Sequence, residues 1–234
     1  MTHAVDRNPR DMEMYFPEHL ADIIYRSVGV KLTGDLTHLY VAEAAKADKQ
    51  IVDKLIAGQV GNRPLLAIAP FSSTVAKDWP VESYREMMRQ LDESTELTYL
   101  LLGGPDDAGR EFPLNSRVID LRGRTNMVQT AELLRRADYF LGSCSAPLHI
   151  ATAVGTPVVA LYGSSSSPKW APKHKCILVE HRWPCTPCDR IEYGWQCNHQ
   201  YPCIKSLTVA EVIEALHQLQ LQYPSSCRRE GGEK

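Results

Sequence analysis

The stretch Tyr139–Gly163, YFLGSCSAPLHIATAVGTPVVALYG, contains the pattern that decides the fold. An apolar run ends in small polar residues after Leu141, a short helix-like segment with Pro147 and His149 follows, and a β-branched run begins at Val158. This order predicts a strand, a helix and a second strand of a parallel sheet. Small residues gather where the first strand meets the helix, and the exposed N–H groups of a helix N-terminus suit phosphate. The stretch therefore predicts a nucleotide site.

The same alternation of strand and helix continues on both sides of this stretch. Further strands are expected at LLAIAPF (65–71), LTYLLLGG (97–104), VIDLRG (118–123) and CILVE (176–180). Helices are expected at VESYREMMRQL (81–91), NMVQTAELLRRA (126–137) and LTVAEVIEALHQL (207–219), the last one capped by Thr208. Connections of this length imply parallel strands in right-handed units. The predicted fold class is α/β, with a Rossmann-like parallel sheet flanked by helices.

The two ends of the chain differ from this α/β region. Residues 1–60 predict mainly helix, with apolar residues at helical spacing in PEHLADIIYRSVGV (17–30), a surface helix at 43–55, and the linker GQVGNRP (58–64). The end of the chain, PSSCRREGGEK (224–234), has the composition of a disordered tail. We therefore expect a helical segment and linker at 1–60, an α/β domain at 61–222 and a tail at 223–234.

Composition narrows the class of protein. The 234 residues carry a formal net charge of −2, which gives no general electrostatic attraction for nucleic acid. No apolar run approaches the roughly 20 residues needed to span a bilayer, and the N-terminus lacks the apolar centre of a signal peptide. We expect a cytoplasmic protein with no transmembrane segment and no nucleic-acid partner.

The segment SSTVAKDWP (72–80) follows a predicted strand directly. The hydroxyls of Ser72 and Ser73 can donate to phosphate oxygens, and Lys77 supplies compensating charge. The alternative is a solvated loop with Lys77 at the surface.

Two other segments offer weaker indications. In LLGGPDD (101–107) the glycines permit a close approach of ligand and Asp107 could accept from ribose hydroxyls, as in dinucleotide folds. The alternative is that Pro105 starts a helix and that Asp107 favours its N-terminal dipole. In the opening stretch, Ser145 and the helix N–H groups could meet a diphosphate, whereas His149 could equally be a structural histidine.

Four of the seven cysteines, Cys185, Cys188, Cys197 and Cys203, have the spacing C-x2-C-x8-C-x5-C. The first pair is typical of a tetrahedral thiolate site. In a cytoplasmic protein such a group favours a structural metal, zinc or iron, over disulfides. A disulfide pair and free buried thiols are the alternatives.

Taken in order, these segments resemble the C-terminal half of glycosyltransferase family 9, the ADP-heptose:lipopolysaccharide heptosyltransferases. The resemblance is carried by PFSSTVAKDWPVESY, LLGGPDD, LRGRTNMVQTAELLRRADYFLG, SCSAPLHIATAVGTPVVALYG and the cysteine segment that begins WPCTPC. It implies the donor-binding Rossmann-like domain of a GT-B enzyme, and it makes residues 1–60 the end of the N-terminal domain and its linker.

The resemblance also implies roles for individual residues. Ser72, Ser73 and Lys77 match the hydroxyl and lysine positions at the donor phosphates, and Asp107 matches a glutamate that meets the ribose. The remaining matches are Thr125 and Met127 beside the base, and Cys144, Ser145, Ala146 and His149 in the motif after the opening strand. Here Cys144 replaces an acidic residue and Ala146 a glycine, and a thiol cannot reproduce the hydrogen bonds of a carboxylate.

The implied activity is inverting transfer of a sugar from an ADP-sugar to a hydroxyl of lipopolysaccharide or another glycan, with no cofactor required for transfer. The family's catalytic base lies near the start of its N-terminal domain, so no catalytic residue is identified in this chain. We expect transfer to need a separate acceptor-domain polypeptide, and a location in the cytoplasm or at the periphery of the inner membrane. The alternative is a non-catalytic nucleotide-binding or metal-stabilised interaction module derived from such an enzyme.

Overall fold

The computed structural model describes residues 44–188, 197 and 199–225. The predicted helix at 17–30 and most of the predicted tail lie outside these residues. The part described contains the whole of the region in which strands and helices were expected to alternate.

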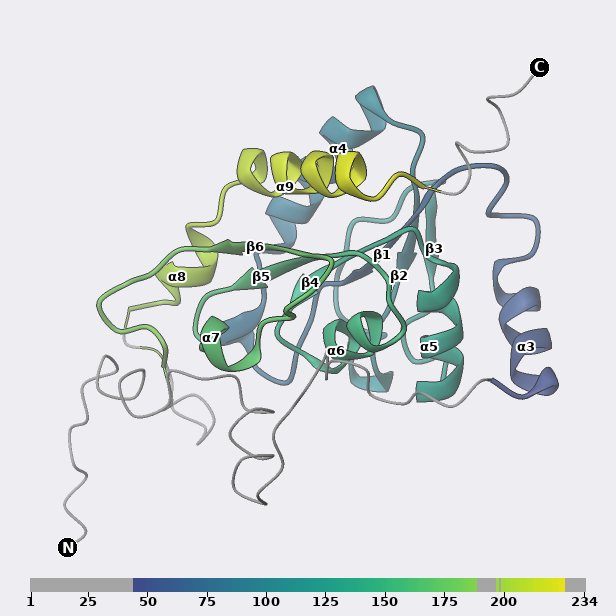
Figure 1. The fold of residues 1–234 in the computed structure, drawn as a ribbon, viewed down its shortest axis with the longest axis horizontal. Helices are drawn as coiled ribbons and strands as arrows, with labels where there is room; N and C mark the ends of the chain where they lie inside the picture. Colours follow the sequence, from purple (N-terminus) through teal and green to yellow (C-terminus); the bar gives the residue numbers. More distant parts are fainter. Residues whose placement is uncertain (1–43, 189–196, 198, 226–234) are drawn as a thin grey trace, which may run out of the picture.

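Six parallel strands form one sheet (Figure 1). They are β1 (Leu65–Ala69), β2 (Thr98–Leu101), β3 (Val118–Asp120), β4 (Tyr139–Ser143), β5 (Val158–Tyr162) and β6 (Cys176–Glu180). Their order across the sheet is β3-β2-β1-β4-β5-β6, and every pairing is parallel. The predicted Rossmann-like α/β fold is confirmed, including a strand at each of the six segments.

Helices cover both faces of the sheet, as Figure 1 shows. One face carries α4 (Val81–Ser94) and α9 (Val209–Gln222); the other carries α5 (Met127–Arg136), α6 (Ala146–Ala153) and α3 (Lys46–Ile56), which packs on α5. Two short helices, α7 (Ser167–Trp170) and α8 (Pro202–Lys205), and the single 3₁₀ turn η1 (Val75–Lys77) were not predicted, whereas the 3₁₀ turn η2 (Pro105–Asp107) lies where a helix start at Pro105 was one alternative. Each of them lies in a connection near the carboxyl edge of the sheet, meaning the edge at which the strands end.

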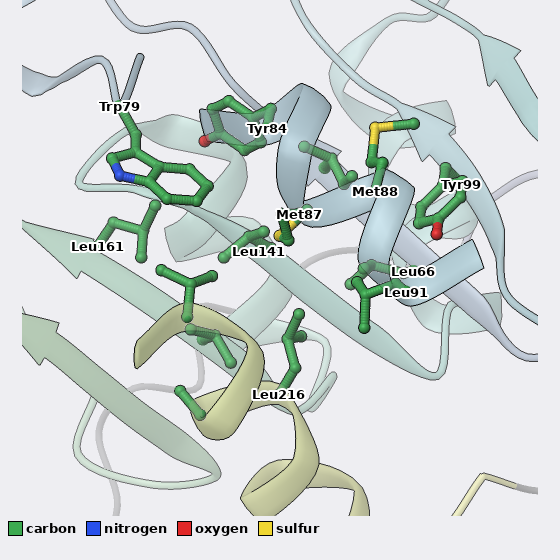
Figure 2. Close-up of a cluster of buried hydrophobic side chains, with 14 of the residues drawn as sticks. Leu66, Trp79, Tyr84, Met87, Met88, Leu91, Tyr99, Leu141, Leu161 and Leu216 are labelled. Carbon is green, nitrogen blue, oxygen red and sulfur yellow. The ribbon is translucent and has the colours of Figure 1, made fainter. Parts of the chain in front are cut away.

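The central strands read as continuous apolar runs because both of their faces are covered. Every residue of β1, β2, β4 and β5 is buried. Side chains from β1 and β4 meet those of α4 and α9 in the cluster shown in Figure 2, where Leu161 lies beside Trp79 and Leu66 lies beside Leu91. The sheet is therefore held between two apolar layers, which fixes the positions of the loops at its carboxyl edge.

The helix ends follow the local rules of sequence. Thr208 caps α9 in a reciprocal arrangement: its hydroxyl accepts from the Glu211 N–H (3.3 Å) and its own N–H donates to the Glu211 carboxylate (2.8 Å). This confirms the predicted cap. Asn126 and Gln129 form the same arrangement at the start of α5.

The predicted surface helix near the linker is α3, and it is more than a surface element. Val52 is fully buried in the apolar cluster between the sheet and the helices on this face. Asp48 accepts a hydrogen bond from the Gln129 side chain (2.9 Å). Asp53 also forms an ion pair with Arg136. The few apolar residues of this charged segment did not reveal the docking in the sequence.

Candidate nucleotide-binding site

The strand order creates a switch point between β1 and β4. The connection from β1 leads to β2 on one side, whereas β4 is followed by β5 on the other, so the two loops diverge. In doubly wound sheets ligands bind outside the carboxyl ends of the strands at this point. Gly142 permits the close pairing of the two strands there, because a Cβ would lie 3.0 Å from the Ala69 carbonyl oxygen.

Parallel pairing brings the predicted residues to one edge of the sheet. Ser72, Ser73 and Lys77 follow β1, Asp107 follows β2, Thr125 and Met127 follow β3, and the segment from Cys144 to His149 follows β4. All of these loops leave strands that end at the carboxyl edge. The ten residues predicted from the sequence therefore lie in connections that leave the same edge of the sheet.

The β1 loop, defined as residues 70–80, is organised around Asp78. One oxygen of this carboxylate accepts from the Ser72 N–H (2.8 Å) and lies 3.0 Å from the Ser72 hydroxyl, which donates to the Thr74 carbonyl (2.8 Å). Burial raises the pKa of Asp78, against the opposing effect of hydrogen bonds from Arg110 and Ser72. Ser72 is thus used inside the loop, where it stabilises the loop conformation.

Two residues of the β1 loop face outward. Ser73 is exposed, and within the described part of the chain its side chain forms no hydrogen bond. The Lys77 ammonium, partly buried, forms no ion pair with any residue that the structure describes. An unneutralised cation beside the switch point is the arrangement that an anionic ligand requires.

Asp107 has a structural role in the turn after β2. Its Oδ2 accepts from the Gly104 N–H (2.9 Å), and a Cβ added at Gly103 would lie 2.8 Å from the same oxygen. This matches the helix-start alternative, although the turn is a single 3₁₀ turn instead of a helix. The Oδ1 atom lies 3.6 Å from Arg110, so each carboxylate oxygen of Asp107 has a partner within the protein.

The segment after β3 is more open. The Thr125 hydroxyl lies 2.9 Å from that of Thr130, and the Met127 side chain is 72% exposed at the start of α5. An exposed methionine at this edge offers an apolar surface on which a flat ring could pack.

The segment after β4 contains the departures from the family pattern. The Cys144 thiol is buried beside Tyr162, whose pKa is raised by burial and further by Cys144. The Ser145 hydroxyl donates to the Ser143 carbonyl (3.1 Å), and Ala146 is exposed at the N-terminus of α6. The N–H groups at this end of α6 face the same edge as Lys77 and carry partial positive charge.

His149 lies one turn into α6, with its ring centroid 6.3 Å from that of Trp170. The Lys169 ammonium in turn lies 5.2 Å from the Trp170 ring. Trp170 and Lys169 belong to α7, after β5, and sequence reasoning missed both. The aromatic residue in SSSSPKW directly after a predicted strand was the available signal.

Sequence reasoning also missed Asp78 and Arg110. Asp78 is part of the quoted segment SSTVAKDWP, but its carboxylate was given no role. Arg110 lies 32 positions further along and reaches it with a 2.7 Å ion pair. No local pattern in the sequence connects the two residues.

The four cysteines lie among the described residues, although most of the segment between Cys188 and Cys197 does not. Burial, together with a smaller effect of the nearby thiols of Cys185 and Cys197, raises the pKa of the Cys203 thiol to about 11. The Cys188 N–H donates to the Ser164 carbonyl (2.7 Å) at the end of β5. Within the described ranges, however, no three side chains of Cys, His, Asp or Glu are grouped closely enough to hold a metal ion.

A cavity of about 540 Å³ lies at the opposite, amino edge of the sheet. Its lining includes Asp92, Glu93 and Glu96, and among the described residues Arg117 is the only basic one that lines it. A carboxylate-rich cavity repels phosphate, and the switch point lies at the other edge. We therefore place the candidate site at the switch point and not in this cavity.

None of the helices in the described ranges combines the length and apolar character needed to cross a membrane.

Comparisons with known proteins agree with this architecture. The family model described as glycosyltransferase family 9 (heptosyltransferase) matches residues 25–197. The lipopolysaccharide core heptosyltransferase OpsX of Haemophilus influenzae is 31% identical over 119 residues, which cover 47% of this chain and 33% of that protein. The chain spans about a third to a half of the length of the curated heptosyltransferases that it matches.

Solved structures show the same fold. The glycosyl transferase family 9 protein from Veillonella parvula superposes with a TM-score of 0.69 at 20% identity, covering 88% of this chain and 61% of that one. The dodecameric iron-containing heptosyltransferase TibC of enterotoxigenic Escherichia coli, in complex with ADP-D-β-D-heptose, gives a TM-score of 0.57 at 22% identity and covers 72% of this chain and 48% of that one.

Proposed function

The chain belongs to glycosyltransferase family 9, and we propose that its α/β domain binds the ADP-sugar donor for transfer to a hydroxyl of lipopolysaccharide or another glycan. The observation that carries this proposal is the Lys77 ammonium, which lies beside the switch point without an ion pair in the described part of the chain. TibC holds ADP-D-β-D-heptose on the same fold, which supports an ADP-sugar as the ligand.

We propose the following positions for the donor. The diphosphate lies between Lys77, Ser73 and the N-terminus of α6 at Ser145 and Ala146. The adenosine lies toward β2 and β3, with the ribose near Asp107 and the base against Thr125 and Met127. The sugar then lies near Cys144 and His149, and Ser72 acts by holding the loop that presents Ser73 and Lys77.

In the proposed reaction an acceptor hydroxyl attacks the anomeric carbon while the bond from that carbon to the diphosphate breaks. The departing diphosphate gains negative charge, which Lys77 and the partial positive charge at the α6 N-terminus would stabilise. The acceptor hydroxyl needs a base to take its proton. Among the described carboxylates at the carboxyl edge, Asp78 and Asp107 are both engaged in ion pairs and hydrogen bonds.

We infer that the base and the acceptor site are supplied outside the described residues, by an acceptor domain. The chain alone then binds the donor and does not transfer the sugar. The experiment is calorimetry of the purified chain with ADP, with UDP as the matched nucleotide, followed by an assay of ADP release from ADP-heptose. We expect ADP binding without efficient transfer; absent ADP binding would contradict the donor role, and efficient transfer by the chain alone would contradict the need for a partner.

A non-catalytic nucleotide-binding module is the second candidate function. The observation that favours it is the Cys144 thiol, buried where the family pattern has an acidic side chain. Adding an acceptor-domain polypeptide separates the two candidates. Restored sugar transfer supports the enzyme, whereas ADP binding that never leads to transfer supports the module.

We propose that the four cysteines form a structural metal site; they are Cys185, Cys188, Cys197 and Cys203. Among the described residues they do not form a close group of three, but the thiols of Cys185 and Cys197 are near enough to Cys203 to act on it electrostatically. A thiolate set of this kind would suit zinc or iron and would stabilise the fold without entering the reaction.

Elemental analysis of protein purified without added metal tests this site. We expect close to one zinc or iron per chain, and loss of that metal in a Cys185→Ser, Cys188→Ser variant. A Cys176→Ser variant is the matched control, because Cys176 lies on β6 outside the group. Less than about 0.1 metal per chain in the parent protein would contradict the proposal.

A further inference from the structure

The β1 loop places a negative charge next to the cation proposed to bind phosphate. Asp78 directly follows Lys77, and its side chain is only 10% exposed. A carboxylate at this position is unfavourable for an anionic ligand unless a cation neutralises it, because water screens a buried charge poorly. The negative charge of Asp78 must therefore be neutralised by a cation from another part of the molecule if an anion is to bind beside Lys77.

Arg110, in a different loop, neutralises the Asp78 carboxylate. Its Nη2 donates to Asp78 Oδ2 at 2.7 Å, while Asp78 Oδ1 accepts from Ser72. The guanidinium also lies 3.7 Å from the centre of the Phe71 ring, which packs against it at the start of the β1 loop. Arg110 thus contacts the loop at two points and leaves both oxygens of Asp78 with partners.

Arg110 is itself firmly placed. Its N–H donates to the Asp107 carbonyl (3.1 Å), and its own carbonyl accepts from the buried Arg122 (2.6 Å). Arg122 is anchored in turn by Asp120 at the end of β3 (2.8 Å). A chain of contacts therefore runs from the end of β3 through the turn after β2 to the loop after β1.

We propose that Arg110 is a positioning residue for the donor diphosphate, which holds the β1 loop through Asp78 and cancels the charge of that carboxylate beside Lys77. This inference rests on the proposed donor role of the loop. Arg110 does not need to touch the ligand. Its effect reaches the ligand through the position of Ser73 and Lys77 and through the local charge.

The charge and the geometry make separable contributions. Without Arg110, negative charge on Asp78 has no neighbouring guanidinium to neutralise it and opposes the diphosphate. An Asp78→Asn substitution removes that charge and keeps an oxygen that can accept from Ser72. We therefore compare the single variant Arg110→Gln with the double variant that carries Asp78→Asn as well. The comparison distinguishes a charge effect from a purely structural one.

The test is calorimetry with ADP and with adenosine, which lacks the diphosphate. For Arg110→Gln we expect about tenfold weaker ADP binding, corresponding to about 1.4 kcal/mol, and a change of less than about twofold for adenosine. The double variant is expected to recover ADP affinity to within about threefold of the parent chain. Arg110→Lys, which keeps the charge but not the planar group over Phe71, is expected to recover part of the affinity that Arg110→Gln loses.

Arg117→Gln is the matched control. Arg117 pairs with Asp92 at the amino edge of the sheet and likewise ties two connections together, so its loss carries a comparable structural cost away from the site. We expect it to lower the thermal midpoint as much as Arg110→Gln does while leaving ADP affinity unchanged.

The outcomes distinguish this inference from the proposed function. A parent chain that does not bind ADP overturns both. A parent chain that binds ADP, with Arg110→Gln within twofold of it, overturns the role of Arg110 alone. If Arg110→Gln does not fold, Arg110→Lys and Asp78→Asn are measured instead, and a tenfold loss of ADP affinity in both would overturn the charge argument.

Discussion

Replacing Trp79 with alanine is expected to lower the free energy of unfolding by about 3–5 kcal/mol. Trp79 is 1% exposed, and its ring packs edge-on against Tyr84 at a centroid distance of 4.8 Å. Figure 2 shows it among side chains of the strands and of the helices on one face of the sheet. Its indole N–H donates to the buried Leu207 carbonyl (2.9 Å), so the substitution leaves both a large cavity and an unpaired carbonyl.

Chemical denaturation followed by circular dichroism measures this effect. The matched control is Trp183→Ala, since the Trp183 side chain is 42% exposed, and we expect it to change the free energy of unfolding by less than about 1 kcal/mol. A Trp79→Ala variant as stable as the Trp183→Ala variant would show that the contact between the β1 loop and Leu207 does not hold the domain together. Because total stabilities are about 5–15 kcal/mol, the variant is expected to unfold at markedly lower denaturant concentrations.

A Lys77→Ala substitution is expected to weaken ADP binding by about 10- to 100-fold. A charge-assisted hydrogen bond contributes about 1.5–3 kcal/mol, and Lys77 has no ion pair in the described part of the chain whose loss could offset that effect. Since its side chain is partly exposed and lies outside the apolar clusters, we expect the free energy of unfolding to change by less than about 0.5 kcal/mol.

Isothermal calorimetry with ADP checks this prediction, with Lys54→Ala as the control. Lys54 is an exposed lysine on α3, far along the chain from the switch point, and its removal changes the net charge equally. Unaltered ADP affinity in the Lys77→Ala variant would remove Lys77 from the phosphate site. An equal loss in both variants would point to a general charge effect.

The strands and the main helices could be predicted because local physics decides them. Buried strands such as β1 and β5 are short apolar runs bounded by glycine or proline, and Thr208 followed by Glu211 is a local capping pattern. The position of the candidate residues at one edge also followed, since parallel strands all end at the same edge of a sheet.

The hydrogen-bond and ion-pair partners of individual side chains could not be predicted in the same way. Asp78 and Arg110 meet across two connections, and the docking of α3 depends on Asp48 meeting Gln129 from 81 positions away. Ser72 has the composition of a phosphate ligand, yet its hydrogen bonds are directed into its own loop. These pairings depend on the distances between loops, which periodicity and spacing do not contain.

The hydrogen bonds of Ser164 make the β1 loop rigid. Its hydroxyl donates to the Ala76 carbonyl (3.1 Å) in the β1 loop, and its carbonyl accepts from the Cys188 N–H (2.7 Å). One buried serine thus joins the loop after β1, the end of β5 and the cysteine segment, while Asp78 fixes the same loop from within. The conformational entropy of the β1 loop is therefore given up when the domain folds and not when a ligand arrives. The donor binding that we propose would therefore need no further ordering of this loop.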